Sequence, residues 1–467
     1  MGVFLIVMNW RYLLIVFISA GLVGGGSLWL AENEDFSISS PINSERLKDS
    51  QEEEEKEFIG DILIIKELDK DLIRQNIEDG KEFLFRMEHP EEHGFYKRYE
   101  AQTDTLEERL HAVYTASIIF TFLRIYDFDK DERILERMPS WADFLLFMQS
   151  KGDETYGAFH YSYYYKDQEK EQRFVVGTSA LTIFTLLDLY EKFGDEKYIQ
   201  SAKMAGDWLL TMQGEDGIMT PFMEKKGDED KSSSSPLTIV REGDKWSYGT
   251  KESLLYNGQV LSSLSRLYEV CQEEKYYTAA KKIAEHFKER TENEGCYLGD
   301  DYRSKNPISS AWVVMALYDF YKIDGEEDYK NIVFDCSREL LKRQRTDTAA
   351  PFYYGVWNMA YSTSGNGWLA EVMMEIYKFC EEEEGNNCED YKTAVLRATR
   401  WIIQNTYSEE NSFNLENPEK AIGGIFWNDK SKYVRTDSNC HALNAYIGIF
   451  DYLEKGILVS LPEGDED

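Results

Sequence analysis

The chain has 467 residues, of which 42% are hydrophobic and 14% aromatic, so it is long and apolar enough to bury a large core. Its 86 acidic residues outnumber its 52 basic residues and give a formal net charge of -34, which argues against nucleic-acid binding, because that requires a basic surface. The 31 tyrosines and 10 tryptophans are typical of surfaces that are both apolar and hydrogen-bonding, such as sugar clefts, although for any single tyrosine a core position is the simpler interpretation.

Residues 1–30 differ in kind from the rest of the chain. The segment from Tyr12 to Leu30 carries no charge and is long enough to cross a bilayer, and Arg11 before it favours a cytoplasmic N-terminus. We predict an uncleaved signal-anchor that makes the protein a single-pass membrane protein with its main domain extracytoplasmic, followed by an acidic tether over 31–60. A cleaved signal peptide is the alternative, since small residues surround Gly24 to Ser27.

Two kinds of helix alternate from residue 61 to residue 457. Amphipathic helices are expected at 70–88, 132–149, 195–213, 275–290, 327–345 and 390–405. Helices that are apolar on nearly every side begin near His111, Gly177, Asn257, Ser309, Gly365 and His441. This alternation predicts an all-α domain, an (α/α)6 toroid of six helical hairpins with the apolar helices inside, ending in an acidic tail over 458–467. An open solenoid is the alternative, but it would expose the apolar helices.

The connections favour one functional face. Links from an inner to an outer helix are short and charged, whereas links from outer to inner helices are long and rich in aromatic and polar residues, at 89–110, 150–176, 214–255, 291–308, 346–363 and 406–438. In a ring, all six long loops emerge at one rim, and long loops on a rigid scaffold usually carry function. Within the third loop, residues 225–236 are predicted to be a disordered insertion.

The cysteines and known motifs give little support for a cofactor. Cys380 and Cys388 bracket an acidic turn between two helices and are the most plausible disulfide among the six cysteines, with six unpaired thiols as the alternative. The sequence contains no zinc-type cysteine spacing, HExxH motif, P-loop or dinucleotide-binding fingerprint. We therefore predict no metal and no cofactor.

Three of the six histidines, His111, His160 and His441, are predicted at or near the N-termini of inner helices. Ring closure makes the sixth hairpin a neighbour of the first, so these imidazoles are candidates for acid/base catalysis, substrate binding or a metal cluster. For each histidine alone, a structural hydrogen bond is the simpler alternative. Separately, two carboxylates among Asp104, Glu252 and Asp301 would suit a glycoside hydrolase.

Part of the chain resembles a known enzyme family. Residues 241–452 are similar to the C-terminal toroid domain of D-glucuronyl C5-epimerases, which invert uronic acids in heparan-type polysaccharides. The segments that carry the resemblance are LLYNGQVLSSLSRLYEV from Leu254, DDYRSKNPISSAWVVMALYDFY from Asp300, GGIFWND from Gly423 and VRTDSNCHALNAY from Val434. They cover less than half of the chain.

The resemblance places family site residues on Asp301, Tyr302, Arg435, Asp437 and Asn444 of this sequence. The chain departs from the family at two positions of functional tyrosines, which are Phe426 and Ser438 here. Epimerisation needs a base on one face of the sugar carbon and an acid on the other. The departures therefore leave the reaction open.

Three hypotheses follow for a polysaccharide or glycoconjugate partner. In an epimerase-like enzyme, Asp301 and Tyr302 would form the acid/base pair, and Arg303 and Arg435 would bind an acidic group. Its sugar platforms would be Tyr248, Tyr256 and Trp357. The alternatives are a glycoside hydrolase that uses loop carboxylates, and a glycan-binding protein without catalysis.

Overall fold

The structure is a computed structural model that describes residues 65, 68–225, 238–240, 245–357, 360, 362–383 and 388–453. The predicted anchor, the acidic tether over 31–60, most of the insertion and the acidic tail lie outside these residues. Within the described part of the chain, no helix is long and apolar enough to cross a membrane.

The predicted alternation of helices is present. The outer helices are α3 (Lys70–Arg86), α5 (Glu132–Met148), α7 (Glu196–Thr211), α9 (Glu274–Glu294), α11 (Glu327–Leu341) and α13 (Glu389–Gln404). The inner helices are α4 (Ala112–Asp129), α6 (Val176–Phe193), α8 (Leu254–Cys271), α10 (Pro307–Asp324), α12 (Thr363–Glu383) and α16 (Thr436–Phe450). Two short helices, α14 (Glu409–Ser412) and α15 (Pro418–Ala421), lie in the sixth long loop.

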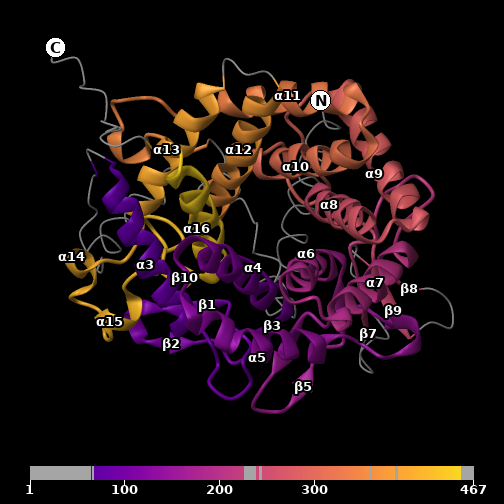
Figure 1. The fold of residues 1–467 in the computed structure, drawn as a ribbon, viewed down its shortest axis with the longest axis horizontal. Coiled ribbons are helices and arrows are strands. Elements are labelled where there is room, and N and C mark those ends of the chain that lie inside the picture. The colour runs from indigo at the N-terminus through magenta and orange to yellow at the C-terminus, as the bar shows by residue number, and fades with distance from the viewer. Residues whose placement is uncertain are drawn as a thin grey trace, which may run out of the picture. The chain divides into compact units, whose positions relative to one another are not determined.

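The inner helices form a closed ring (Figure 1). Each packs against the next in the order α4, α6, α8, α10, α12 and α16, and α16 packs back against α4. This contact closes the ring and confirms the toroid over the open solenoid. The outer helices surround the ring and shield the apolar inner helices from water, which stabilises the fold by burying apolar surface.

Local sequence explains where the helices begin and end. The inner helix α10 begins at Pro307, whose fixed φ suits a first helical position, and the side chain of Asn306 accepts a 2.8 Å hydrogen bond from the Ser309 N–H. Asn306 therefore caps this helix, slightly before the expected start. The helix ends at Gly325, which has φ +79° in the left-handed region that favours glycine.

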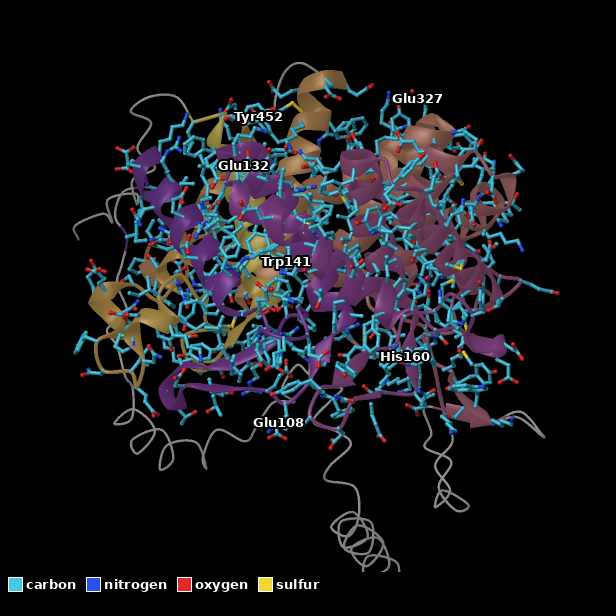
Figure 2. All side chains as sticks on the ribbon, turned by 60° about the horizontal axis from the view of Figure 1, so that its bottom comes forward. Glu108, Glu132, Trp141, His160, Glu327 and Tyr452 are labelled. Carbon is cyan, nitrogen blue, oxygen red and sulfur yellow. A yellow bond between two sulfur atoms is a disulfide. The ribbon has the colours of Figure 1, made fainter. Side chains whose placement is uncertain are left out.

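The first two long loops lie away from the short links. Figure 2 shows Glu108, from the first long loop, at one edge of the molecule and His160, from the second, in the same half, whereas Glu132, Glu327 and Tyr452 lie toward the other edge. Glu132 and Glu327 follow short links directly, since each begins an outer helix. The first two long loops thus lie on the side away from the short links, as was predicted for all six loops.

Short strands, which the sequence did not predict, join neighbouring long loops. One sheet contains β10 (Val434–Arg435), β1 (Arg98–Glu100) and β2 (Thr105–Leu106), and a second contains β3 (Leu110–His111), β4 (Ser162–Tyr164) and β5 (Glu169–Lys170). A third contains β6 (Arg173–Val175), β7 (Phe222–Lys225), β9 (Trp246–Gly249) and β8 (Thr238–Val240). Arg98 pairs with Arg435, so the first sheet ties the last long loop to the first.

Two disulfides stabilise the ring. Cys380 and Cys388 join the end of α12 to the start of α13, which confirms the predicted bridge. Cys296 and Cys336 form a second bridge, which joins the fourth long loop to α11 and was not predicted. Both bridges close loops of the unfolded chain and so reduce its conformational entropy.

Candidate active site in the ring

Each inner helix turns one side toward the interior of the ring. On α4 the half-buried positions Val113, Ser117, Phe120 and Arg124 recur every three or four residues, whereas the positions between them are buried. This spacing is that of one helix face. Because the outer helices cover the opposite side, we take this face to line a channel along the ring axis. On α16, His441 is a corresponding half-buried position.

A histidine, a glutamate and an arginine from three inner helices meet in this channel. His441 Nδ1 on α16 lies 2.8 Å from Glu371 Oε2 on α12. Glu371 Oε1 accepts a 3.0 Å hydrogen bond from the Asn444 amide and lies 3.7 Å from Arg124 Nη1 on α4. We call His441, Glu371 and Arg124 the channel triad.

The channel triad leaves one imidazole nitrogen available. Because Glu371 is an acceptor, His441 Nδ1 carries the hydrogen, and Nε2 of the neutral ring keeps its lone pair. Within the described part of the chain, Nε2 makes no hydrogen bond. A base with an oriented ring and a free lone pair can accept a proton from a ligand in the channel.

Aromatic packing fixes the position of His441. The Trp368 ring centre lies 5.4 Å from that of His441, and Trp312 stacks on Trp368 at 3.9 Å. At Gly367 a Cβ would lie 3.0 Å from His441 Cβ, so the absence of a side chain lets α12 approach α16 closely. The backbone of α16 near His441 is therefore held tightly.

The fourth long loop is organised by Asp300. The buried Asp300 carboxylate accepts hydrogen bonds from the N–H groups of Leu254, Tyr302 and Arg303, at 2.9, 3.0 and 2.9 Å. Burial raises the pKa of Asp300, against the opposing charge of Arg303. Arg303 Nη1 lies 3.5 Å from the Asp300 carboxylate. The neighbouring Asp301 is exposed, and its carboxylate accepts a hydrogen bond from the Glu252 N–H. Asp300 thus holds the loop against the start of α8.

Tyr302 lies in the fourth long loop, beside the start of α8. The hydroxyl oxygen of Tyr302 is buried and has no hydrogen-bond partner among the described residues. Burial, together with the neighbouring Tyr256, raises the pKa of Tyr302 to about 12, so it is protonated at neutral pH. Its loop is bonded to α8, and α8 is three places from α16 in the six-membered ring. Tyr302 and His441 therefore belong to different hairpins of the ring.

Arg435 lies at the junction of the first and last long loops. It bonds Asp437 through Nε and Nη2, at 3.1 and 2.8 Å, and Nη2 donates to the Tyr114 hydroxyl at 2.7 Å. Its guanidinium also stacks on Trp427, 4.6 Å from the ring centre. The side chain is almost fully buried, so these contacts hold the two loops together.

The structure does not join the three predicted histidines into one cluster. His111 is fully buried, with Nε2 3.3 Å from Glu107, and burial lowers its pKa against the effect of Glu107. His160 Nδ1 lies 2.8 Å from the Glu171 carbonyl oxygen, and burial lowers its pKa as well. Each ring has its own partner on a different element. Among the described residues, no group of three or more His, Cys, Asp or Glu is arranged to hold a metal ion.

Two of the three carboxylates proposed for hydrolysis are paired with cations. Asp104 lies 2.8 Å from Lys420 Nζ, and hydrogen bonds from Lys420, Asn417 and Tyr99 hold its pKa below the usual value, although burial opposes them. Glu252 lies 2.6 Å from His286 and 2.7 Å from Arg290, both on the outer helix α9. Each carboxylate thus has different neighbours and is already neutralised.

The three predicted sugar platforms differ in access. Trp357 is 0% exposed, and its Nε1 donates a 2.9 Å hydrogen bond to the Leu340 carbonyl, so its ring cannot touch a sugar in this structure. Tyr248 is half-buried in β9. Tyr256 is half-buried on the first turn of α8, where a Cβ at Gly177 would lie 2.7 Å from its ring. The Trp357 assignment is therefore corrected.

Several residues were not among the predicted site residues, namely the half-buried Arg124 and Glu371 of the channel triad, the buried Trp312 and Trp368 beside His441, and Asp300 in the fourth long loop. A usable signal was present for Glu371, which is the single charged residue in the stretch from Trp368 to Met374 of an otherwise apolar helix. A lone charge on such a helix requires a partner or a polar cavity.

Solved structures with the same architecture include carbohydrate-active enzymes. The chain is similar to the cellobiose 2-epimerase of Bacillus thermoamylovorans, with TM-score 0.61 and 15% identity over 82% of this chain and 99% of that one. An α-1,6-mannanase of Salegentibacter gives TM-score 0.56 and 13% identity over 82% and 100%. An unsaturated glucuronyl hydrolase specific for heparin gives 0.56 and 10% over 82% and 98%. No family model and no curated protein matches the chain. These likenesses show the fold.

Proposed function

We propose that the protein is a carbohydrate-active enzyme that transfers a proton on a sugar ring or chain, as an epimerase or isomerase does. The observation that carries this proposal is the channel triad, in which Glu371 orients His441 and leaves its Nε2 available. Support also comes from the toroid fold, which this chain shares with a cellobiose 2-epimerase and a D-mannose isomerase.

His441 and Tyr302 suit the two halves of such a reaction, which are the removal and the return of a proton. His441 Nε2 would take a proton from a carbon next to a carbonyl or carboxyl group, and the electron pair of the broken C–H bond would form an enediol or enediolate. In an isomerase, the protonated Tyr302 hydroxyl would give its proton to the carbonyl oxygen and take one back from the neighbouring hydroxyl, while the proton on His441 returns to the adjacent carbon. In an epimerase, Tyr302 would protonate the opposite face of the same carbon and regain a proton from solvent, while His441 releases its proton to solvent.

Two substrate positions fit this chemistry. One is C2 of an open-chain reducing sugar, and the other is C5 of a uronic acid in a polysaccharide, which the resemblance of residues 241–452 favours. The hydrolase hypothesis has less support, because Asp104 and Glu252 are paired with Lys420 and with His286 and Arg290. A hydrolase requires two carboxyl groups that flank the scissile bond.

Proton exchange in deuterated water tests the proposal. The protein is incubated with mannose, cellobiose and glucuronate-containing oligosaccharides, and deuterium at C2 or C5 is followed by NMR and mass spectrometry. We expect deuterium incorporation without chain cleavage, and a loss of at least about 100-fold in His441→Asn and at least about tenfold in Tyr302→Phe. Release of new reducing ends without exchange would favour the hydrolase, and glycan binding without turnover would favour a binding protein.

The chain provides a matched control for His441. His93 also pairs its Nδ1 with a glutamate, Glu88, at 2.9 Å, but it lies in the first long loop after the outer helix α3. His93 has φ +60°, a conformation that asparagine tolerates. His93→Asn should leave proton exchange within about twofold of the wild-type rate. Equal rates in His441→Asn and His93→Asn would remove His441 from the mechanism.

A further inference from the structure

Arg124 is the member of the channel triad that comes from α4. It lies in the C-terminal half of α4, toward the rim of short links, and its guanidinium packs 4.4 Å from the Phe120 ring centre. Arg124 Nη1 approaches the Glu371 oxygen that faces away from His441. The guanidinium and the imidazole thus contact the two different oxygens of one carboxylate.

Arg124 belongs to a belt of charges contributed by the inner helices. Arg266 on α8 bonds Asp319 on α10 at 3.0 Å, and Glu375 on α12 pairs with Lys378 at 2.9 Å. Asp188 on α6 makes no hydrogen bond or ion pair among the described residues, and the charges of Arg266 and Arg124 act on it. Asp188 and Arg266 also line a cavity of about 310 Å³ between α6 and α8.

The two arginines of this belt have different ion-pair partners. Arg266 is committed to Asp319, which Lys322 approaches at 2.7 Å as well. Arg124 makes its single ion pair within the described residues with Glu371, while Asp188 and Glu375 attract it from a greater distance. Among these cations, Arg124 is therefore the one whose loss changes the electrostatic potential at the Glu371 carboxylate most.

We propose that Arg124 is a positioning residue for His441 that acts through Glu371, an inference that rests on the proposed proton-transfer function. The guanidinium holds Glu371 Oε1, which leaves Oε2 aligned with His441 Nδ1. It also offsets part of the carboxylate charge that otherwise stabilises a protonated imidazole. Arg124 thereby keeps His441 oriented and available as a base.

This role predicts a change in pH dependence. Without the positive charge, His441 holds a proton more easily, so the acidic limb of the kcat/KM profile moves to higher pH. At pH 6, kcat/KM of such a variant should be about three- to tenfold lower than that of the wild type. This size follows from the interaction of charges several ångströms apart in a partly enclosed site. KM should change less than twofold, because the proposed positioning role gives Arg124 no contact with the sugar. The charged groups that act on Arg124 are Glu371 and Glu375 from α12 and Asp188 from α6, and Arg266 from α8 acts on Glu375 and Asp188 as well.

The test compares Arg124→Gln, Arg124→Met and Arg124→Lys with Arg137→Gln in the full chain. Arg137 on the outer helix α5 lies 2.8 Å from Glu88, so its loss removes an arginine–glutamate pair outside the channel. We expect both neutral variants to shift the profile, the lysine variant to shift it less, and Arg137→Gln to leave it unchanged. Two neutral variants are used in case one of them fails to fold.

A second readout separates this inference from the proposed function. Nitrogen-15 NMR of the His441 imidazole reports which ring nitrogen carries the hydrogen, whether or not the protein turns over a sugar. Altered imidazole signals in the neutral Arg124 variants, in a protein without exchange activity, would support the positioning role and contradict the function. Unchanged signals and a superimposable pH profile in an active protein would overturn the positioning role alone.

Discussion

The chain contains two triads of histidine, glutamate and arginine with the same chemistry and different surroundings. In the channel triad, Glu371 lies 2.8 Å from His441 and 3.7 Å from Arg124. In the outer triad, which consists of His93, Glu88 and Arg137, Glu88 lies 2.9 Å from His93 and 2.8 Å from Arg137. Contact distances alone would rank the outer triad as the better formed.

The difference lies in where the triads are built. The channel triad joins three inner helices, and its histidine and arginine side chains are 25% and 34% exposed. The outer triad joins the loop after α3 to the outer helix α5, and the corresponding side chains are 41% and 49% exposed. The two glutamates are similarly enclosed, at 12% exposed for Glu371 and 7% for Glu88, so the difference lies in the histidine and arginine, which water screens more strongly in the outer triad. Location on the inner helices, rather than the pairing itself, makes such a triad a candidate for catalysis.

The largest expected effect comes from replacing the glutamates. Glu371→Gln removes the carboxylate that orients His441, so we expect kcat for proton exchange to fall about 100-fold, as is typical when the orienting carboxylate of a catalytic histidine is removed. Glu88→Gln should leave kcat within about twofold. Initial rates of deuterium incorporation at saturating substrate measure both variants. Similar losses of kcat in the two variants would contradict a catalytic role that is specific to the channel triad, because the effect would then reflect folding.

An intermediate effect is the pH dependence of stability that comes from Asp188, a carboxylate on which the charge of Arg124 acts. Burial raises the pKa of Asp188 to about 6 from a usual value of 3.8, against the opposing charges of Arg266 and Arg124. Between these values the folded protein binds more protons than the unfolded chain. The free energy of unfolding therefore falls as the pH rises through this window and stays lower above it.

Asp188→Asn should accordingly stabilise the protein by on the order of 1–2 kcal/mol at pH 7 and by little at pH 3.5, after allowance for partial exposure of the side chain. Chemical denaturation at the two pH values measures the difference. Asp143→Asn is the control, since Asp143 is exposed on the outer helix α5 and should change stability by less than about 0.5 kcal/mol. A gain in Asp188→Asn that does not depend on pH would contradict a raised pKa.

The sequence predicted the ring better than the site. Hydrophobic periodicity is local, so the alternation of amphipathic and apolar helices was visible without any knowledge of tertiary contacts. The strands on the loop rim were missed because they are only two to four residues long, and some of them, such as β1 and β10, pair between loops that are distant in sequence. The bridge from Cys296 to Cys336 was missed for the same reason, since forty positions separate the two residues.

The channel triad depends on ring closure. Helical periodicity places His441 and Glu371 each on its own helix, but it does not state which faces meet across 70 residues of sequence.

Asp301 was preferred to Asp300 because a carboxylate before a tyrosine matched the family pattern, whereas burial decides that Asp300 organises the loop. Trp357 was assigned to the surface because aromatic loop residues often bind sugars, yet its ring fills the core.

The smallest expected effect is the salt dependence of the two arginine–glutamate pairs. A double-mutant cycle of Arg137→Gln and Glu88→Gln should give a coupling free energy of about 0.3–0.5 kcal/mol at low salt, as for exposed pairs. In about 0.5 M sodium chloride the Debye length shortens to roughly 4 Å, so this coupling should approach zero. The same cycle for Arg124 and Glu371 should keep more than half of its coupling, because the ring limits the access of counterions. Equal salt sensitivity of the two pairs would show that the channel is as open to solvent as the outer wall, and would remove the physical reason for assigning the two triads different roles.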